Sequence, residues 1–312
     1  MKKMSEPIVF FGSGPVAADS LRLLAVDYEV EAIITKPRAP HHHGPVPVLS
    51  LADELKIPVH TVETKAQLDT LFAARPFRSR LGVLIDFGII VSQQVINYFP
   101  KGIINSHFSL LPEWRGADPI TFSILSGQQR TGVSLMLLVP AMDEGPILSN
   151  TSFDIPSTMT TPELTKELIN ESNQALHHVI PLYLNNEAKS ASQAATAQAL
   201  NRSTEPTYSR KLTKQDGEID WRKPAERLER EIRAYIEWPK SKATFDDTEV
   251  TITKATVVYF SGPAGTTAVT HKHPIVYCGE NALQLDRLKP AGKKEMTGQE
   301  FLAGYRKQFL QS

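Results

Sequence analysis

Short apolar runs alternate with amphipathic stretches along the first half of the chain. Strand-like runs cover residues 8–11 and 30–35, and between them Val16, Leu21 and Leu24 recur at helical spacing. The same alternation predicts further strands over 81–86, 102–105 and 131–138, with helices over 49–56, 91–99 and 162–184. Strands separated by helices form a parallel sheet with helices on both faces, so the pattern predicts an α/β domain.

The pattern changes past the middle of the chain. Residues 187–207 are rich in Ala, Ser, Gln and Thr and show little apolar periodicity, which is typical of a linker. We therefore expect domains over 1–188 and 207–312 joined by a linker over 189–206, and the length of 312 residues also favours two domains. The second domain is predicted to contain a helix over 224–235 and strands over 242–245, 249–259, 275–278 and 283–288. Closely spaced short strands are typical of a small β-barrel.

Charge and cysteine content narrow the class of protein. Lys plus Arg and Asp plus Glu each total 34, so no bulk charge draws the whole chain to nucleic acid or to a membrane. Residues 205–312 carry 18 Lys and Arg against 15 Asp and Glu, a mild excess that fits either RNA contact or an ordinary solvated surface. The single cysteine, Cys278, excludes an intramolecular disulfide and fits a reducing compartment.

The chain shows no pattern of a targeting or membrane segment. Its N-terminal apolar run ends at Gly12, which makes it shorter than the apolar region of a signal peptide. Nowhere does an uninterrupted apolar stretch reach the roughly 20 residues that cross a bilayer. We therefore expect a soluble, cytoplasmic protein without a membrane partner.

A glycine-rich turn follows the first predicted strand. Residues 12–17, Gly-Ser-Gly-Pro-Val-Ala, match the G-x-G-x-x-A fingerprint of dinucleotide-binding proteins. Such proteins normally carry an acidic residue at the end of the second strand, where this chain has Lys36. A lysine there suits the 2′-phosphate of NADP, so an NADP-dependent oxidoreductase stays open. The alternative is that the glycines only allow a tight turn and close packing of the helix.

The segment richest in candidate chemistry begins at Asn105. It reads Asn-Ser-His-Phe-Ser-Leu-Leu-Pro over 105–112 and lies at the carboxyl end of a predicted strand, where open α/β sheets place their ligand sites. Residues two apart on a strand point to the same side, so the Asn105 amide and the His107 imidazole should converge. Acyl transfer to an amine needs a donor for the developing oxyanion and a group that handles the amine proton, and this pair supplies both.

A later loop offers a carboxylate to this pair. Asp143 follows the strand predicted over 131–138, and its side chain would orient the His107 imidazole and raise its basicity. Taken singly, each residue also has a purely structural interpretation: Asn105 as a turn former, His107 as a hydrogen-bonded core histidine and Asp143 as a solvated turn acid. The combination of the three favours the catalytic hypothesis.

Two segments resemble a known family, the folate-dependent formyltransferases. NSHFSLLPEWRGADPI, over 105–120, is similar to the family signature N-x-H-x-SLLP-x-x-RG-x-x-P, and MDEGPIL, over 142–148, is similar to the segment that supplies the family's catalytic aspartate. The resemblance implies formyl transfer from 10-formyltetrahydrofolate, with Asn105, His107 and Asp143 as the catalytic residues. It also implies folate contacts from Ser109, Leu110, Leu111, Pro112, Asp86, Phe87 and Gly88.

The second half of the chain resembles the C-terminal domain of those family members that act on methionyl-tRNA. The similar segments are YSRKLTK over 208–214, IDW over 219–221 and LKPAGKK over 288–294. The resemblance implies a Rossmann-like domain followed by an OB-like β-barrel that helps to hold tRNA, with initiator methionyl-tRNA as the acceptor of a monomeric enzyme. The candidate tRNA contacts are Lys36, Arg38, Lys211, Lys214, Lys293 and Lys294.

Two other functions stay open beside this one. Sugar-nucleotide N-formyltransferases share the signature and also carry an added C-terminal domain, so an amino-sugar nucleotide is the alternative acceptor. The non-enzymatic alternative is a module that senses folate or binds RNA without turnover. An intact catalytic trio would have no purpose in such a module.

The loop over 36–45 departs from the family pattern. Members that act on tRNA usually carry a longer, strongly basic loop here, whereas this chain has His41, His42 and His43 between prolines. Adjacent histidines without a neighbouring Cys or acid give poor geometry for one metal ion, so we expect no metal. The short loop leaves open how the tRNA is read.

Overall fold

Two compact units make up the chain in the computed structural model, which describes residues 4–40 and 44–311. The N-terminal unit contains Met1–Pro119, Arg130–Asp154 and Thr165–Ser209. The C-terminal unit contains Ile120–Gln129, Ile155–Leu164 and Arg210–Ser312. The domain limits expected at 188 and 207 stay a prediction, and His41, His42 and His43 lie outside the described residues.

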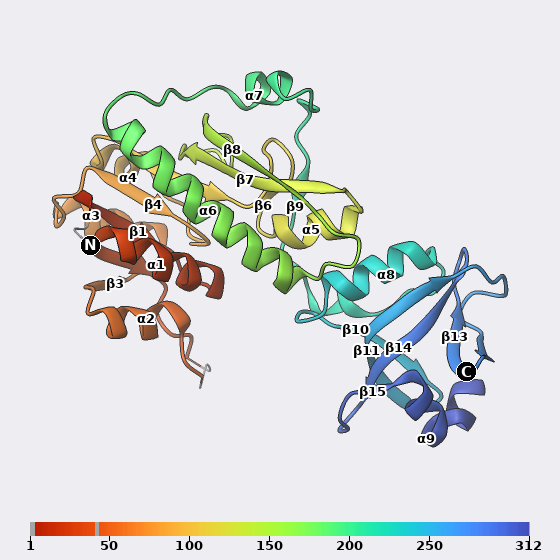
Figure 1. The fold of residues 1–312 in the computed structure, drawn as a ribbon. Helices are drawn as coiled ribbons and strands as arrows, with labels where there is room; N and C mark the ends of the chain where they lie inside the picture. The colour runs from red at the N-terminus through yellow and green to blue at the C-terminus, as the bar shows by residue number, and fades with distance from the viewer. Residues whose placement is uncertain (1–3, 41–43, 312) are drawn as a thin grey trace. The chain divides into compact units, whose positions relative to one another are not determined.

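The N-terminal unit is built on a sheet whose strands lie in the order β3-β2-β1-β4-β5-β7-β8 (Figure 1). The strands are β1 (Met4–Phe11), β2 (Tyr28–Thr35), β3 (Val59–Thr61), β4 (Leu81–Leu84), β5 (Ile103–His107), β7 (Arg130–Leu137) and β8 (Ile147–Asp154). The strands from β3 to β5 pair in parallel, which confirms the predicted α/β architecture. Two short strands, β6 (Arg115–Gly116) and β9 (Tyr208–Ser209), form a separate parallel pair.

The sheet is mostly parallel, as predicted, but one edge of it is antiparallel, which the sequence did not predict. β7 pairs antiparallel with β5, and β8 pairs antiparallel with β7. The chain that leaves β5 enters β7 at the same end of the sheet, and a short loop then joins β7 to β8 as a hairpin. The sequence did not predict β8 because its residues, Ile-Leu-Ser-Asn-Thr-Ser-Phe-Asp, are mostly polar and only partly buried.

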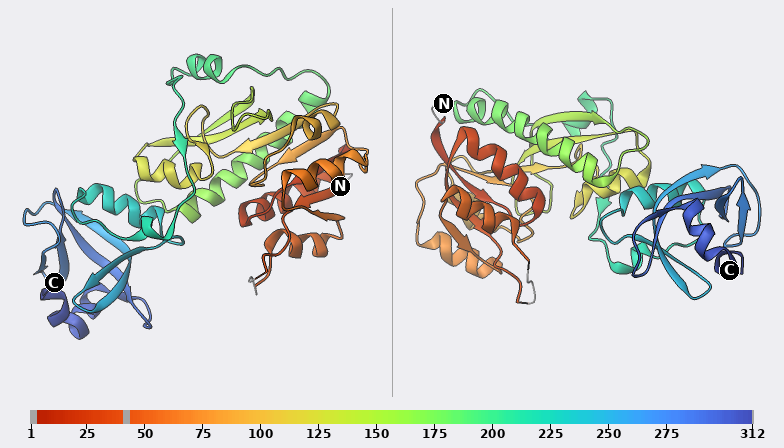
Figure 2. Two further views of the ribbon diagram at one scale, coloured as in Figure 1. Left: turned by 180° about the vertical axis from the view of Figure 1, so that it is seen from behind. Right: turned by 60° about the horizontal axis from the view of Figure 1, so that its bottom comes forward.

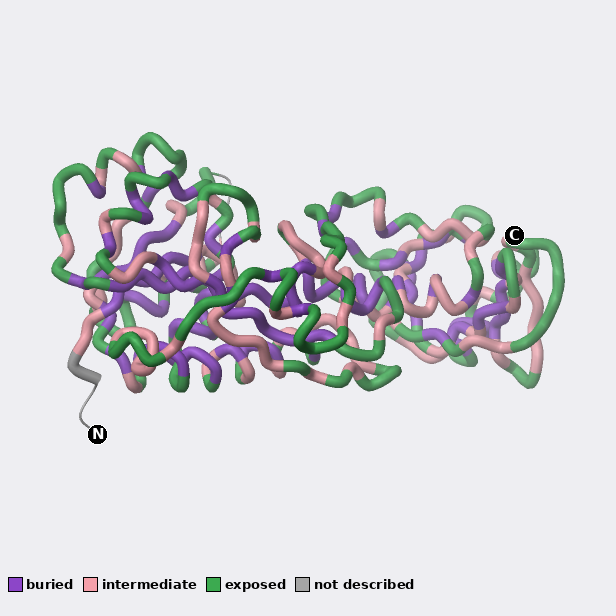
Figure 3. Tube along the Cα trace, turned by 90° about the horizontal axis from the view of Figure 1, so that it is seen from above, coloured by how far each residue is buried: buried purple, intermediate pink, exposed green. Residues whose placement is uncertain are grey.

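Helices cover both faces of the N-terminal sheet. They are α1 (Pro15–Asp27), α2 (Pro47–Leu55), α3 (Lys65–Ala73), α4 (Gln93–Tyr98) and α6 (Thr161–Leu184), with α7 (Gln193–Ala199) outside the sheet layers. α3 and α4 pack on one face, where Phe72 stacks on Phe11 of β1, while α1 and α6 lie on the other (Figure 2). The residues of the central strands β4, β5 and β7 are mostly buried, which explains their continuous apolar runs; Figure 3 colours each residue by its burial.

The C-terminal unit is built on an antiparallel sheet in the order β10-β11-β14-β13-β12, with β15 paired to β14. Its elements are η1 (Lys214–Gly217), α8 (Ala225–Ala234), β10 (Ser241–Phe245), β11 (Thr248–Val258), β12 (Thr267–Thr270), β13 (His273–Tyr277), β14 (Ala282–Pro290), β15 (Met296–Thr297) and α9 (Gly298–Leu310). The predicted helix and four strands are confirmed. Among the described residues no pairing between β10 and β12 closes the sheet, so the barrel stays a prediction.

Helices complete the core of the C-terminal unit. α9 packs on the sheet through Phe301 and Phe309, and both rings contact Phe245 of β10. Helix α8 also forms hydrogen bonds with two segments from earlier in the chain. Arg227 donates to the carbonyl oxygen of Leu125 near the end of α5 (Pro119–Ser126), and Arg233 donates to that of Met159 at 2.7 Å.

Within residues 4–40 and 44–311, no helix combines the length and the apolar character that crossing a membrane requires.

Candidate active site

Strand β5 carries Asn105 and His107 on one face. Each of the two residues is 6% exposed. Ser106, between them, points to the opposite face, where its hydroxyl lies 2.7 Å from that of Ser172 on α6. β4 and β7 pair with the two edges of β5. The strand is therefore fixed from behind and from both sides, and it holds the two candidate side chains in place.

Asp143 reaches this pair from the loop between β7 and β8. Its Oδ1 lies 3.7 Å from His107 Nδ1 and 3.5 Å from Asn105 Nδ2, and its Oδ2 accepts a hydrogen bond of 2.8 Å from the backbone N–H of Gly116. Asp143 has φ 53°, a left-handed conformation that Asp tolerates better than most residues. The structure thus brings the three residues expected to be catalytic into one site.

A contact of His107 with a backbone carbonyl indicates which ring nitrogen carries the hydrogen. Nε2 lies 3.0 Å from the carbonyl oxygen of Trp114. A carbonyl only accepts, so the N–H is assigned to Nε2, and Nδ1 carries the lone pair. Because Nδ1 faces the Asp143 carboxylate, the pair can take up one proton together. Such a pair suits a reaction in which an amine must lose a proton.

Gly116 supplies a donor that only a glycine can place. Its φ is +115°, in the region that favours glycine, and a Cβ at this position would lie 2.3 Å from the carbonyl oxygen of Ser209. This close approach is the β6–β9 pairing, in which Arg115 lies opposite Tyr208 and Gly116 opposite Ser209. The pairing therefore places the Gly116 N–H on the carboxylate of Asp143.

Gln193 is a site residue that the sequence did not predict. It begins helix α7, within the segment expected to be a linker, and is 6% exposed. Its side-chain amide donates to the carbonyl oxygens of Asp143 at 2.7 Å and of Gly145 at 3.1 Å. No sequence signal marked Gln193, because its neighbours are small and polar and show no apolar periodicity.

The loop over 109–112, for which folate contacts were expected, is fixed by Ser134 of β7. The Ser134 hydroxyl donates to the carbonyl oxygen of Ser109 at 2.7 Å and accepts from the backbone N–H of Leu111 at 2.9 Å. The side chains of Ser109, Leu110 and Leu111 are buried. The loop is thus part of the core, and its backbone carries the chain from β5 towards β6.

Arg202 also holds this loop and was not predicted from the sequence. Its Nη2 donates to the carbonyl oxygens of Leu110 at 2.6 Å and of Leu111 at 2.9 Å. Its Nε lies 3.6 Å from Oε1 of Glu113. Burial raises the pKa of the Glu113 carboxyl, and the charge of Arg202 opposes this rise. Residues of the expected linker thus contact both loops of the site.

Asp86, Phe87 and Gly88, the other expected folate residues, follow β4. Phe87 is buried, and the Lys36 ammonium lies 2.9 Å from where a Cβ on Gly88 would be. Asp86 lies against the glycine turn, since its Oδ2 is 2.0 Å from where a Cβ on Gly14 would be. A carboxylate at this place repels a pyrophosphate. The turn therefore serves close packing and not dinucleotide binding.

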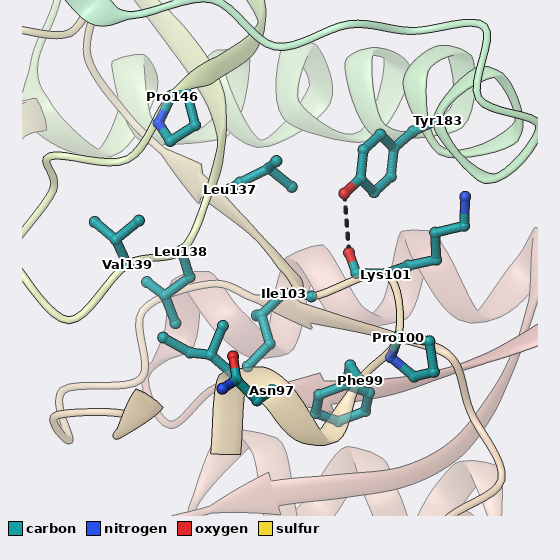
Figure 4. A pocket seen from close by; sticks show the side chains of 12 residues that line it. Asn97, Phe99, Pro100, Lys101, Ile103, Leu137, Leu138, Val139, Pro146 and Tyr183 are labelled. Carbon is teal, nitrogen blue, oxygen red and sulfur yellow. Dashed lines mark hydrogen bonds between the residues drawn. The ribbon is translucent and has the colours of Figure 1, made fainter. Parts of the chain in front are cut away.

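A cavity of about 490 Å³ lies at the amino end of β5 (Figure 4). Its walls include Ile103 of β5, Leu138 and Val139 after β7, and Tyr183 of α6, whose hydroxyl donates to the carbonyl oxygen of Lys101 at 3.1 Å. Ile103 and Asn105 point to the same side of β5 and lie about 7 Å apart along it. The cavity is thus adjacent to the site, although its lining residues are not those expected to bind folate.

The residues expected to contact tRNA lie on the surfaces of their units. Lys211, Lys214, Lys293 and Lys294 are exposed on the C-terminal unit. On the N-terminal unit, Arg38 is exposed and Lys36 is partly buried. Across the residues that the structure describes, no group of three or more His, Cys, Asp or Glu side chains is arranged to hold a metal ion.

Solved structures share this fold at low sequence identity. A structure of WlaRD, a sugar 3N-formyl transferase, with dTDP and 5-N-formyl-THF superposes with a TM-score of 0.66 and 17% identity over 93% of this chain and 100% of that one. HypX from Aquifex aeolicus superposes with a TM-score of 0.64 and 14% identity over 99% of this chain and 50% of that one. These similarities support the fold alone.

Sequence comparisons reach further. The family model for formyl transferase matches residues 28–180, and the model for the formyl transferase C-terminal domain matches residues 211–306. The chain is 34% identical to a methionyl-tRNA formyltransferase of Chloroflexus aurantiacus, over 95% of this chain and 96% of that protein. It is 33% identical to that of Methylococcus capsulatus over the same shares. The chain therefore belongs to the formyl transferase family.

Proposed function

We propose that the chain transfers the formyl group of 10-formyltetrahydrofolate to the α-amino group of methionyl-initiator-tRNA, as a monomer in the cytoplasm. The observation that carries the proposal is the cluster of the buried Asn105 and His107 with the partly buried Asp143. Membership of the family supports folate as the source of the formyl group. The relatives that match nearly the whole chain, and that are named methionyl-tRNA formyltransferases, support the acceptor.

The proposed reaction is a direct acyl transfer. The lone pair of the neutral α-amine attacks the formyl carbon, a C–N bond forms, and the carbonyl electrons move to oxygen. When the carbonyl forms again, the bond between that carbon and N10 breaks, and N10 takes the electron pair and a proton to leave as tetrahydrofolate. The pair of His107 and Asp143 takes the proton lost by the amine and passes a proton on to N10, so the pair ends the reaction as it began.

The site supports the charge that develops on the formyl oxygen. The contact from Asn105 Nδ2 to Asp143 is long, at 3.5 Å, and therefore weak. The Asn105 amide can thus donate a stronger hydrogen bond to the oxyanion. His107, once protonated on Nδ1, adds a positive charge beside it. The fixed strand and loops hold these groups before the substrate arrives, which is the main source of rate in this kind of transfer.

The cavity beside the site suits the pterin ring of the donor. Its volume of about 490 Å³ lies within the usual range for small-molecule sites, and apolar side chains such as Ile96, Ile103 and Val139 suit a flat ring. A ring beside Ile103 would direct its N10 arm along β5 towards Asn105. In this arrangement the loops over 86–88 and 109–112 border the rest of the folate.

We further propose that Lys36 and Arg38 on the N-terminal unit, and Lys211, Lys214, Lys293 and Lys294 on the C-terminal unit, contact the tRNA. Lysine and arginine bind phosphate oxygens and give affinity without reading the base sequence. The five exposed side chains among them, all except Lys36, are available for such contacts.

The catalytic roles are tested by Asn105→Ala and His107→Ala. Each is expected to lower kcat about 10²- to 10³-fold, because each removes a group that stabilises the transition state. The measurement is single-turnover formylation of charged initiator tRNA with a labelled formyl donor, with circular dichroism to check folding. A near-normal rate would remove that residue from the mechanism. If the protein formylated amino-sugar nucleotides and not the charged tRNA, the proposal that methionyl-tRNA is the acceptor would be wrong.

The pterin assignment is tested by filling the cavity. Val139→Trp places a large ring among the lining residues, so the KM for the formyl donor is expected to rise about tenfold or more while the KM for tRNA changes little. The matched control is Val26→Trp on α1, where the valine is 64% exposed. An unchanged donor KM in a folded Val139→Trp variant would place the pterin elsewhere.

Asp86 is a second acidic group near the site. Asp86 is exposed as a residue, although many protein atoms lie around its carboxyl. This loss of surrounding water raises the pKa of Asp86 to about 6; the charge of Lys36 opposes the rise, and that of Asp118 adds to it. Between about pH 4 and pH 6 the folded protein therefore binds more protons than the unfolded chain, so this group makes stability fall as the pH rises through that window.

Asp86→Asn is expected to raise the melting temperature at pH 7.5, since the neutral amide removes the unfavourable charge and tolerates the same left-handed backbone. At pH 4, where the wild-type carboxyl is protonated in the folded state, the difference should vanish. Differential scanning calorimetry measures both, with Asp53→Asn at an exposed position of α2 as the control. A variant with the wild-type melting temperature at both pH values would contradict the raised pKa of Asp86.

Contact of the C-terminal unit with tRNA is tested by replacing both Lys293 and Lys294 with Ala. Removing two phosphate contacts should weaken tRNA binding several-fold and lower the salt slope of log K by roughly 2, with an unchanged KM for the donor. The control is a double variant of Lys56 and Lys65, exposed on the N-terminal unit. Equal salt slopes for both double variants would mean that Lys293 and Lys294 do not contact the tRNA.

A further inference from the structure

Gln193 is part of a closed ring of hydrogen bonds around the candidate catalytic carboxylate. Its Nε2 donates to the carbonyl oxygens of Asp143 and Gly145, at 2.7 and 3.1 Å, and its Oε1 accepts from Nη2 and Nε of Arg115, at 2.7 and 3.2 Å. The next residue, Gly116, donates its N–H to the Asp143 carboxylate at 2.8 Å. One side chain thus links the backbone of Asp143 to the segment that binds its carboxylate.

The orientation of the Gln193 amide is forced by its partners. The two carbonyls only accept and the guanidinium only donates, so exchanging the amide oxygen and nitrogen would lose all four bonds. At 6% exposure, water cannot replace them. A buried amide with both N–H groups and both lone pairs in use fixes the groups around it more firmly than an apolar side chain of equal volume.

We infer that Gln193 is a positioning residue for formyl transfer, which holds Asp143 at its distance from His107. The inference rests on the proposed function, in which this pair takes the amine proton. Gln193 binds the carbonyl oxygens on both sides of Glu144, so the backbone that sets the direction of the Asp143 side chain is fixed at two points. The segment between α6 and the C-terminal unit thereby completes the site.

Gln193→Glu separates positioning from packing. The two side chains have nearly the same shape, and the carboxylate still accepts from Arg115, but it has no N–H to donate and faces two carbonyl oxygens. We expect kcat to fall about 10- to 100-fold, as small misplacements of catalytic groups do, with both KM values within about threefold of wild type. Gln193→Met keeps the volume but makes none of the four hydrogen bonds. It should lower kcat by a similar factor, again with little change in either KM value.

The matched control is Gln198→Glu, at an exposed position of the same helix, which should leave kcat unchanged. A crystal structure of Gln193→Glu supplies a readout besides activity. The distance from Asp143 Oδ1 to His107 Nδ1, 3.7 Å here, is expected to lengthen. Wild-type kcat in a folded Gln193→Glu variant, or an unchanged distance, would overturn the inference. Failure of the wild-type protein to formylate any acceptor would instead reject the proposed function, and the distance would still test the inference.

Discussion

A carboxylate almost removed from water is stable only where hydrogen-bond donors surround it. The Asp143 side chain is 13% exposed, and its neighbours come from separate parts of the chain: Asn105 and His107 from β5, and the Gly116 N–H from the β6–β9 pair. The Gly116 N–H makes the short hydrogen bond to the carboxylate, at 2.8 Å, and losing it would leave a largely buried charge with the long contacts alone. The hydrogen-bonding requirement of the Asp143 carboxylate therefore constrains the positions of the loops after β5 and β7. These positions bring the three catalytic candidates together.

The sheet supplies the rigidity that this arrangement needs. β5 is bound behind by the contact between Ser106 and Ser172, and the loop that follows it is bound by Ser134 of β7. These buried hydroxyls have their partners within the core, so the strand and the loop that carry the site are held by hydrogen bonds. A site prepared in this way suits a reaction in which placement and electrostatics supply most of the rate.

Local patterns in the sequence were enough for most of the fold and for the identity of the catalytic candidates. Alternation along β5 predicted that Asn105 and His107 share a face, and the motif around Asp143 added the carboxylate. The sequence did not predict Gln193 or Arg202, because their contacts join positions about 50 to 90 residues apart within a segment of small polar residues. The cavity was missed for the same reason, since its walls meet only when β5, β7, α4 and α6 pack together.

The charge of Asp143 is the centre of this account, and Asp143→Asn tests it most directly. The amide keeps the shape of the side chain and an oxygen for the Gly116 N–H, but it cannot take a proton from the amine. The single-turnover rate of methionyl-tRNA formylation is predicted to fall at least about 10²-fold with substrate affinities retained. A folded variant that reacts at nearly the wild-type rate would contradict the account.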